Sequence, residues 1–324
     1  MKKNLLLRLG LTLGTLLAML LLFALFMLLL PLTESADTTP VSGSADWMAR
    51  LPDETKLNAL VIPGTHDSAT KYVQLAYFSK CQSLTVGEQL EAGYRYLDIR
   101  LGDADKGADY PRLMHGFTNC RRSLLGGKLY LDEVLADCCA FLAQHPTETV
   151  LFVVKHEHGD RSDAEMAKAL DGFVQARPND WLVTDTMPTL GQARGRLVLL
   201  RRWEGGSGLP FLWTDQKGAS DVTQNSVRED QGEFALWVQD RFEYGAEDKW
   251  AAFTAGLGVP AEEGDVVLSF LSTKGPSAYG HPYQFAEKLN AKLMSLDSAQ
   301  LRGWIVVDYA SPRLAEHIYG ANFG

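Results

Sequence analysis

Several apolar stretches of this sequence end in side chains that could perform acid–base chemistry. The first, Leu60–Ile62, leads through a Pro-Gly pair to His66 and Asp67. A histidine can take and give a proton near neutral pH, and a neighbouring aspartate can hold its imidazole in one tautomer. Taken alone, the segment is explained equally well by an ordinary turn with a polar tip. The residues that follow the other apolar stretches favour a catalytic loop over an ordinary turn.

The remaining apolar stretches end in residues of the same kinds. They lead to Asp98 and Arg100, His115, Lys155 to Glu157, Arg201 and Arg202, Asp240 and Arg241, and Asp308. In a parallel β/α barrel the carboxyl ends of the strands share one face, so these side chains would meet in one cleft. Two histidines can divide the roles of acid and base, while Arg and Lys neutralise a phosphodiester. The pattern therefore indicates acid–base chemistry on a phosphate.

The segments between these residues predict the elements that would position them. We expect strands at 60–62, 94–100, 112–115, 149–155, 196–202, 234–240, 266–271 and 304–308, and helices at 86–92, 131–144, 163–176, 286–296 and 311–319. The strands are apolar throughout, which is typical of a parallel sheet buried on both faces. Eight strands with interspersed helices favour one closed β/α barrel. An open doubly wound sheet is the alternative, although neither G-x-G-x-x-G nor a P-loop follows the first strand.

The N-terminus carries a targeting signal. Residues 1–31 contain three cations and no acid, and all three cations precede the apolar stretch Leu9–Leu30. That stretch is long enough to span a bilayer as a helix and longer than a usual signal-peptide core, and no clean A-x-A site follows it. We expect an uncleaved anchor, with a cleaved signal peptide and a secreted protein as the alternative. In both cases the positive-inside rule leaves residues 32–324 outside the cytoplasm.

The rest of the chain divides into two parts. Residues 32–46 are small and polar, which predicts a flexible linker, and residues 47–324 would form one catalytic domain. The chain has a formal charge of −9, so the part after the cationic segment 1–31 is more acidic still. Broad nucleic-acid binding requires a basic surface and is not expected. An anionic ligand would have to be bound by a local cluster of cations.

Four cysteines lie in the exported part. They are Cys81, Cys120, Cys138 and Cys139. An even number in an oxidising compartment predicts one or two disulfides, and three full pairings are possible. Adjacent cysteines on a helix should not bond each other, and a zinc site is the weaker alternative because the spacings match no common pattern.

Six segments together resemble the bacterial phosphatidylinositol-specific phospholipase C family. In order, they are Pro63–Ser68, Leu97–Arg100, Leu113–Gly116, Val150–Glu157, Leu197–Arg202 and Val306–Tyr309. Each is short, but their order and spacing extend over residues 47–320. The resemblance implies a distorted, partly open barrel of the TIM type. It also implies cleavage of phosphatidylinositol, or of its glycosylated forms, into diacylglycerol and inositol 1,2-cyclic phosphate.

The resemblance further implies a role for each catalytic residue. His66 would deprotonate the inositol 2-hydroxyl, whose oxygen attacks the phosphorus, and His115 would protonate the leaving oxygen of diacylglycerol. Asp308 would support His66, and Asp67 would support His115. Arg100 would contact the phosphate. It stands where calcium-dependent relatives have a metal-binding acid, so neither a metal nor another cofactor is expected.

The headgroup would be bound by a second set of residues. Lys155, Arg202 and Asp240 match inositol-binding positions, and Phe242 stands where a ring-stacking tyrosine is expected. The implied partner is a membrane surface that contains phosphatidylinositol. The sequence does not settle the oligomeric state, and a monomer is the expectation. Two alternatives stay open. One is a phosphodiesterase for another glycerophospholipid, and the other is an inactive barrel that binds lipid or glycan.

Overall fold

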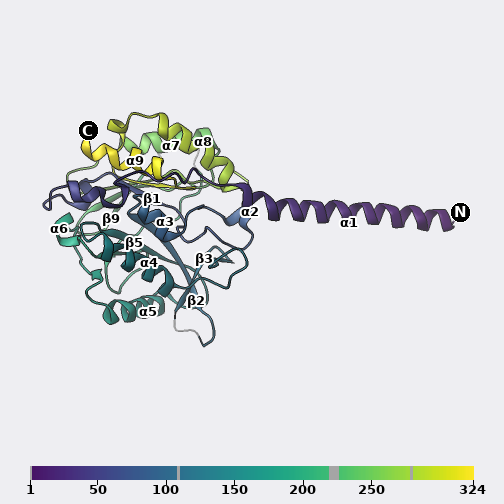
Figure 1. Ribbon diagram of the computed structural model, residues 1–324, viewed down its shortest axis with the longest axis horizontal. Coiled ribbons are helices and arrows are strands. Elements are labelled where there is room, and N and C mark those ends of the chain that lie inside the picture. The colour runs from purple at the N-terminus through teal and green to yellow at the C-terminus, as the bar shows by residue number, and fades with distance from the viewer. Residues whose placement is uncertain (1, 108–109, 219–225, 278–279) are drawn as a thin grey trace.

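A curled, mostly parallel sheet forms the centre of the computed structural model, which describes residues 2–107, 110–218, 226–277 and 280–324 (Figure 1). Its strands follow the order β6 (Trp181–Leu182), β7 (Leu197–Arg201), β5 (Val150–His158), β2 (Tyr96–Ala104), β1 (Ile62–Thr65), β12 (Trp304–Val307), β11 (Val266–Phe270), β10 (Ala235–Gln239) and β9 (Val227–Asp230). All neighbours are parallel except β10 and β9. Within the described residues β6 and β9 do not pair with each other, so the barrel is partly open. The closed barrel expected from the strand pattern is wrong, and the partly open one is confirmed.

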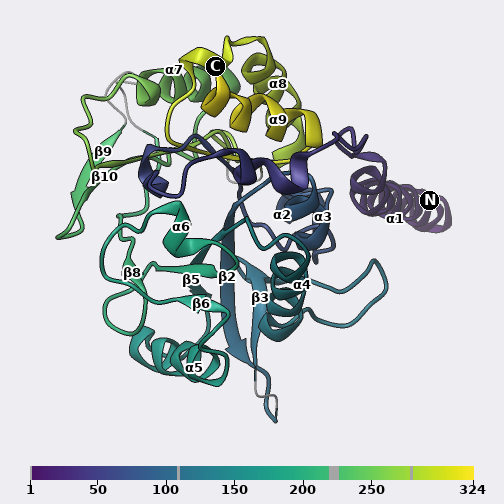
Figure 2. The same cartoon turned by 60° about the vertical axis from the view of Figure 1, so that its left-hand side comes forward.

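Helices cover the outside of the sheet on two sides (Figures 1 and 2). They are α2 (Ala76–Ser79), α3 (Val86–Glu91), α4 (Leu131–Gln144), α5 (Asp163–Ala176), α6 (Leu190–Ala193), α7 (Ala246–Leu257), α8 (Pro282–Ser295) and α9 (Pro312–Gly320), with short 3-10 turns at Ser44–Arg50, Leu57–Ala59, Ser298–Gln300 and Ala321–Phe323. Helices α7, α8 and α9 lie together on one side, and α4 and α5 lie on the other. This arrangement buries both faces of the central strands.

Strand β5 shows why the strands are apolar throughout. Val150, Phe152 and Val154 pack in one cluster with residues of α4 and α5. Leu151 and Val153, on the opposite face of the strand, belong to a second cluster. Because successive side chains of a strand point to opposite faces, a strand with apolar packing on both faces shows no polar alternation.

The structure differs from the expected parallel arrangement at β3 (Pro111–His115). This strand is antiparallel to β2 and continues into β4 (Thr118–Asn119), while β8 (Leu209–Pro210) pairs with β7. Only a short loop joins β2 to β3. A parallel pair needs a crossover of about a dozen residues or more, so the short loop permits only an antiparallel pair.

Helix α7 was not predicted because its buried face is not apolar. That face carries Lys249 and Gly256 beside Ala252 and Phe253. The Lys249 ammonium is fully buried and donates hydrogen bonds to Gln239 Oε1 and to the carbonyl of Arg241. A lysine and a glycine at inward positions remove the helical period of apolar residues on which the prediction depends.

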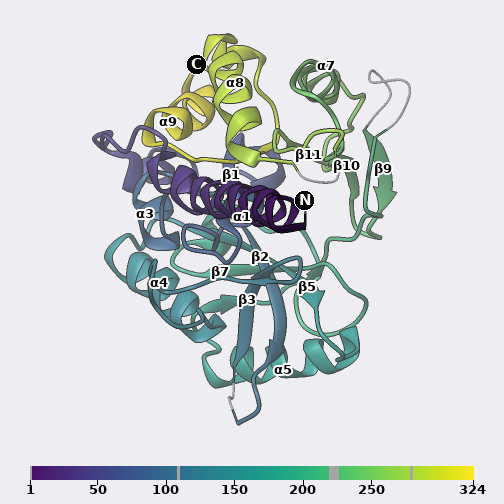
Figure 3. The same cartoon turned by 90° about the vertical axis from the view of Figure 1, so that its right-hand side faces the viewer.

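Helix α1 (Lys2–Thr33) projects from the barrel beside α2 (Figures 1 and 3). Its segment Arg8–Thr33 is long and apolar enough to cross a membrane, and a signal sequence would have the same properties. The chain that follows α1, which the sequence predicts to be a flexible linker, contacts the barrel at both of its ends. At one end Ala36 N donates to Ser83 Oγ, and at the other Arg95 donates to the carbonyls of Ser44 and Ala45. A polar composition does not reveal such contacts, because their partners lie far away in the sequence.

Candidate active site

Eight of the nine predicted site residues line one cavity of about 490 Å³ at the carboxyl ends of the parallel strands. They are His66, Arg100, His115, Lys155, Arg202, Asp240, Phe242 and Asp308. The ninth, Asp67, is buried beneath the two histidines. The antiparallel β3 still delivers His115, because the strand runs back along β2 from Ala104, and its pairing of Leu113 with Leu101 brings its last residues to the level of Arg100. The structure therefore brings the predicted residues together from segments up to 242 positions apart.

The loop that carries His66 is held by backbone contacts on several sides. His66 N donates to the carbonyl of Val307, and Gln82 Nε2 donates to the carbonyls of His66 and Val307. Gly64 is needed just before it, because an added Cβ would lie 2.9 Å from Tyr96 Cβ. Asp67 has a φ of 44°, in the left-handed region that aspartate tolerates better than most residues. The loop is thus fixed before any ligand arrives.

Asp67 lies between the two histidines. Its Oδ2 is 3.2 Å from His66 Nε2 and 3.4 Å from His115 Nε2. His66 Nδ1 donates to Asp308 Oδ1 at 2.7 Å. His115 Nδ1 donates to the carbonyl of Ser79 at 2.8 Å, and since a carbonyl only accepts, this nitrogen carries a proton. Each ring is therefore oriented through Nδ1 and presents Nε2 to the shared carboxylate.

The charges around His66 favour its protonated form. Burial alone would lower its pKa, but the carboxylates of Asp308 and Asp67 outweigh burial and raise the pKa to about 9. Burial also raises the pKa of Asp67, while the nearby Arg100 and the histidines oppose that rise. The His66 ring is thus an imidazolium at neutral pH and must lose a proton before it can act as a base.

Arg100 is the cation nearest to the histidines, and it is surrounded by carboxylates. Its guanidinium lies 3.2 Å from Asp67, 3.0 Å from Asp98 and 3.2 Å from Glu157. Although burial opposes the charged form, these carboxylates raise the pKa of Arg100. Arg100 in turn keeps the pKa of Glu157 low despite burial, and Glu157 also accepts a hydrogen bond from Gly116 N. Glu157 thereby connects the arginine to the turn after His115.

The far wall of the cavity combines the cations Lys155 and Arg202, the carboxylates of Asp215 and Asp240 and the ring of Phe242. Trp213 does not line the cavity but supports this wall from within the protein. Lys155 Nζ lies 3.5 Å from Asp215, and Arg202 stacks 3.4 Å from the ring centroid of Trp213. Trp213 Nε1 donates to Asp240 Oδ2 at 2.9 Å. Alternating donors and acceptors beside an apolar ring suit a polyhydroxylated ligand. Sequence reasoning missed Asp215 and Trp213, because neither follows a predicted strand.

A metal is poorly accommodated at this site. Among the described residues, the group of side chains that could hold a metal ion is His66, Asp67 and Cys81, whose ligand atoms lie within 4.8 Å of one another. Arg100, however, places a permanent positive charge 3.2 Å from Asp67. Burial also raises the pKa of the Cys81 thiol, whereas a metal would bind the thiolate. The charges present therefore oppose a divalent cation between these three residues.

The expected disulfides are wrong for this structure. All four cysteine side chains, at positions 81, 120, 138 and 139, are free. Cys81 lies under the catalytic cavity, Cys138 faces the core from α4, and Cys139 lies beside Asp180. Counting cysteines did not reveal that three of the four are buried as free thiols.

Comparisons with known proteins find relatives that cover most of the chain. Residues 56–203 match the family model described as phosphatidylinositol-specific phospholipase C, X domain. The 1-phosphatidylinositol phosphodiesterase of Staphylococcus aureus (strain Newman) is 27% identical over 286 residues, which are 82% of this chain and 88% of the relative. The enzyme of that name from Listeria monocytogenes is 27% identical over 332 residues, which are 94% of this chain and 96% of the relative.

Solved structures show the same fold. A structure of the S. aureus phosphatidylinositol-specific phospholipase C has a TM-score of 0.71 at 23% identity, covering 85% of this chain and 97% of that one. The L. monocytogenes enzyme has a TM-score of 0.63 at 23% identity, covering 86% and 98%. These likenesses confirm the barrel that the sequence resemblance implied.

Proposed function

Since this chain belongs to the phosphatidylinositol-specific phospholipase C X-domain family, we propose that it is a phosphodiesterase that cleaves phosphatidylinositol at a membrane surface. The observation that carries this proposal is the placement of Asp67 between His66 and His115, with Arg100 beside them. Two imidazoles and a guanidinium around one cavity are the groups that an in-line attack on a phosphodiester requires.

The proposed reaction uses the inositol 2-hydroxyl as the nucleophile. Neutral His66 takes the hydroxyl proton at Nε2 while the oxygen forms its bond to phosphorus. The bond from phosphorus to the diacylglycerol oxygen breaks, and that oxygen takes a proton from His115 Nε2. Arg100 offsets the negative charge on the phosphate oxygens. The products are diacylglycerol and inositol 1,2-cyclic phosphate, and no step needs a metal.

The headgroup is proposed to lie against the far wall of the cavity. Lys155, Arg202 and Asp240 supply charged partners for ring hydroxyls, and Phe242 offers a ring face. Phe242 lacks the hydroxyl of the tyrosine expected there. This difference favours, as a second candidate, a phosphodiesterase whose preferred headgroup differs from unmodified inositol.

The N-terminal helix is proposed to remain attached as a membrane anchor, with residues 47–324 as the catalytic domain outside the cytoplasm. Lys80 Nζ donates to the carbonyls of Pro31 and Glu34, and the Glu34 carboxylate pairs with His281 at 2.6 Å. Glu34, Lys80 and His281 are all buried. Cleavage that removed this segment would leave Lys80 and His281 without these partners, and unsatisfied buried polar groups cost about 1–3 kcal/mol each.

A substrate panel tests the proposed activity. Full-length protein is incubated with vesicles that contain phosphatidylinositol, phosphatidylcholine or phosphatidylglycerol, and water-soluble phosphate is measured. We expect release from phosphatidylinositol alone, and a loss of at least about 10²-fold in the variants His66→Ala and His115→Ala. Release from phosphatidylcholine, which has no hydroxyl placed for internal attack, would refute the proposed nucleophile. Vesicle binding without release would instead support an inactive lipid-binding barrel.

A further inference from the structure

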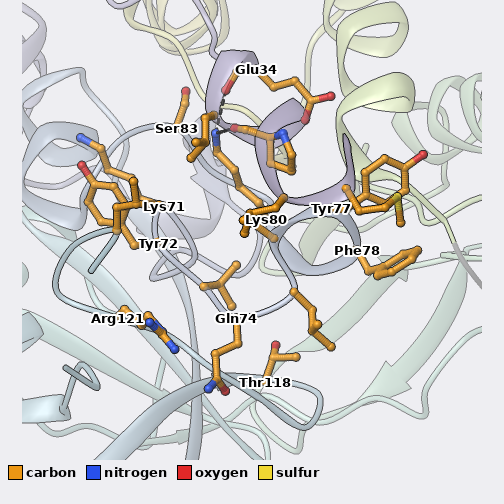
Figure 4. Close-up of a pocket in the computed structure, with 18 of the residues that line it drawn as sticks. Glu34, Lys71, Tyr72, Gln74, Tyr77, Phe78, Lys80, Ser83, Thr118 and Arg121 are labelled. Carbon is orange, nitrogen blue, oxygen red and sulfur yellow. Dashed lines mark hydrogen bonds between the residues drawn. The ribbon is translucent and has the colours of Figure 1, made fainter. Parts of the chain in front are cut away.

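A second and larger cavity lies outside the catalytic cavity, between α1 and the barrel. Its volume is about 880 Å³. One wall is the last third of α1, and the other walls come from the loop after the catalytic His66-Asp67 pair and from the turn after His115. Figure 4 shows Tyr77 and Phe78 on one side of this groove and Tyr72 on the other, with Lys80 and Glu34 closing it near the end of the helix.

The groove continues into the catalytic cavity. Leu75, Phe78, Phe117 and Thr118 line both. His115, proposed to protonate the leaving oxygen, is two residues before Phe117 in the same turn. A largely apolar wall therefore leads from the catalytic histidines to the side of α1. An apolar group attached to a phosphate in the catalytic cavity can lie along this wall without crossing a charged surface.

The groove also lies at the level of a membrane surface. If α1 crosses the bilayer, the segment from Ala24 to Leu32 that lines the groove lies in its outer half, and Glu34 lies at the outer boundary. Phe117, Leu124 and Leu125 are exposed near the same place, and Leu125 is 93% exposed. Exposed apolar residues beside a membrane helix enter the interface rather than water. A lipid in the outer half of the bilayer would therefore need to move only a little out of the membrane to enter the groove.

We propose that this groove holds the acyl chains of the phospholipid whose phosphate occupies the catalytic cavity, so that the anchor helix forms part of the substrate site. The inference rests on the proposed phosphodiesterase function and adds to it an apolar subsite for the diacylglycerol leaving group. The contacts of Lys80 and Glu34 with the barrel hold α1 in the position that forms the groove. The enzyme would thereby act on lipids of the membrane in which it is anchored.

Two pairs of variants test the groove. Ala24 lines it and Ala18 does not, so Ala24→Phe should fill the groove while Ala18→Phe adds the same ring elsewhere on α1. A second pair is Leu28→Trp in the groove and Leu22→Trp outside it, at residues 65% and 66% exposed. These pairs separate a filled groove from a general disturbance of the membrane helix.

The first measurement compares two substrates of the full-length protein in vesicles. We expect each groove variant to lower kcat/KM for long-chain phosphatidylinositol about tenfold or more, because lost positioning commonly costs one or two orders of magnitude. Activity on a soluble inositol phosphodiester without acyl chains should stay unchanged, and the control variants should match the wild type on both substrates. Equal losses in groove and control variants, or equal losses on both substrates, would overturn the proposal.

The second measurement does not depend on turnover. Phosphatidylinositol with a photoactivatable group in one acyl chain is incorporated into the vesicles and irradiated, and the labelled peptides are identified. We expect labels in residues 71–78 and 117–124, reduced by Ala24→Phe and retained in Ala18→Phe. Should the wild type cleave neither substrate, the proposed function fails and labelling alone decides on the groove. Absence of label from these segments, or a mature protein without α1, would overturn the inference.

Discussion

Replacement of Asp308 by asparagine should strongly change the titration of His66. Asp308 accepts a hydrogen bond from His66 Nδ1 at 2.7 Å, and its charge is the largest influence that raises the pKa of the ring to about 9. The rise from 6.5 corresponds to about 3 kcal/mol in favour of the protonated ring, at roughly 1.4 kcal/mol per pKa unit. At pH 7 only about one ring in a hundred would be neutral.

The Asp308→Asn variant retains the size of the side chain but removes its charge. Because an opposite charge in contact shifts a pKa by about one to three units, we expect the His66 pKa to fall by at least about one unit. Turnover should nevertheless decrease, because the asparagine no longer fixes the imidazole tautomer. The assay is NMR titration of the His66 ring protons, with kcat/KM measured over the same pH range.

A matched control removes a carboxylate far from the site. Glu247→Gln changes a residue whose side chain is 82% exposed, and it should leave the His66 titration unchanged. In the wild type, the pH profile of kcat/KM should be bell-shaped, because His66 must be deprotonated and the general acid must be protonated in the same molecule, and the raised pKa of His66 should set one limb of the bell. A wild-type His66 that titrates at or below 6.5, or one that Asp308→Asn leaves unshifted, would refute the reasoning.

Three further predictions concern stability, phosphate binding and headgroup binding. Because folding raises the pKa of His66, the protonated ring contributes its full stabilisation below about pH 6.5, and this stabilisation is lost as pH rises through about 9. In urea unfolding, the free energy of unfolding of the wild type should therefore exceed that of His66→Gln at pH 6, and the difference should shrink by pH 9.5. Arg100→Ala should lower kcat on phosphatidylinositol by about 10²–10³-fold, and a decrease below tenfold would exclude a role in stabilising the transition state. Trp213→Phe removes the hydrogen bond to Asp240 and should raise KM more than it lowers kcat, which steady-state kinetics with soluble substrate can measure.

Most of the residues that line the catalytic cavity could be chosen from the sequence, because strand ends are visible in it. Each parallel strand is buried on both faces, so it appears as an apolar run, and the first charged residue after the run marks its carboxyl end. His66, Asp240 and Asp308 were located in this way, and Arg202 follows the first charged residue after its run, Arg201. The register of β1 with β12, which pairs Thr65 with Val307, places His66 beside Asp308.

Other features depend on contacts that no local pattern encodes. The inward Lys249 can be buried because Gln239 Oε1 and the carbonyl of Arg241 accept hydrogen bonds from its ammonium group, and neither acceptor can be recognised from the helix sequence. Trp213 is held in place by stacking against Arg202 and by its hydrogen bond to Asp240. The direction of β3 was missed because the apolar pattern of a strand is the same in both orientations.

The N-terminal segment shows the same limitation on a larger scale. Its length and composition indicate a membrane helix, but its contacts with the barrel come from residues such as Lys80 and His281, far along the chain. Polar residues between two apolar regions are typical of a linker, and here Glu34 is buried instead. Only the folded chain shows that the end of the helix lines a groove next to the catalytic cavity.

The most direct test of the account is the identity of the first phosphate product formed from phosphatidylinositol by full-length protein in EDTA. Phosphorus NMR distinguishes a cyclic phosphodiester from a phosphomonoester during the reaction. The account predicts that inositol 1,2-cyclic phosphate appears first and at an undiminished rate in EDTA, and that neither His66→Ala nor His115→Ala forms it. An acyclic inositol phosphate as the first product, or activity that EDTA abolishes and a divalent cation restores, would contradict the proposed acid–base mechanism.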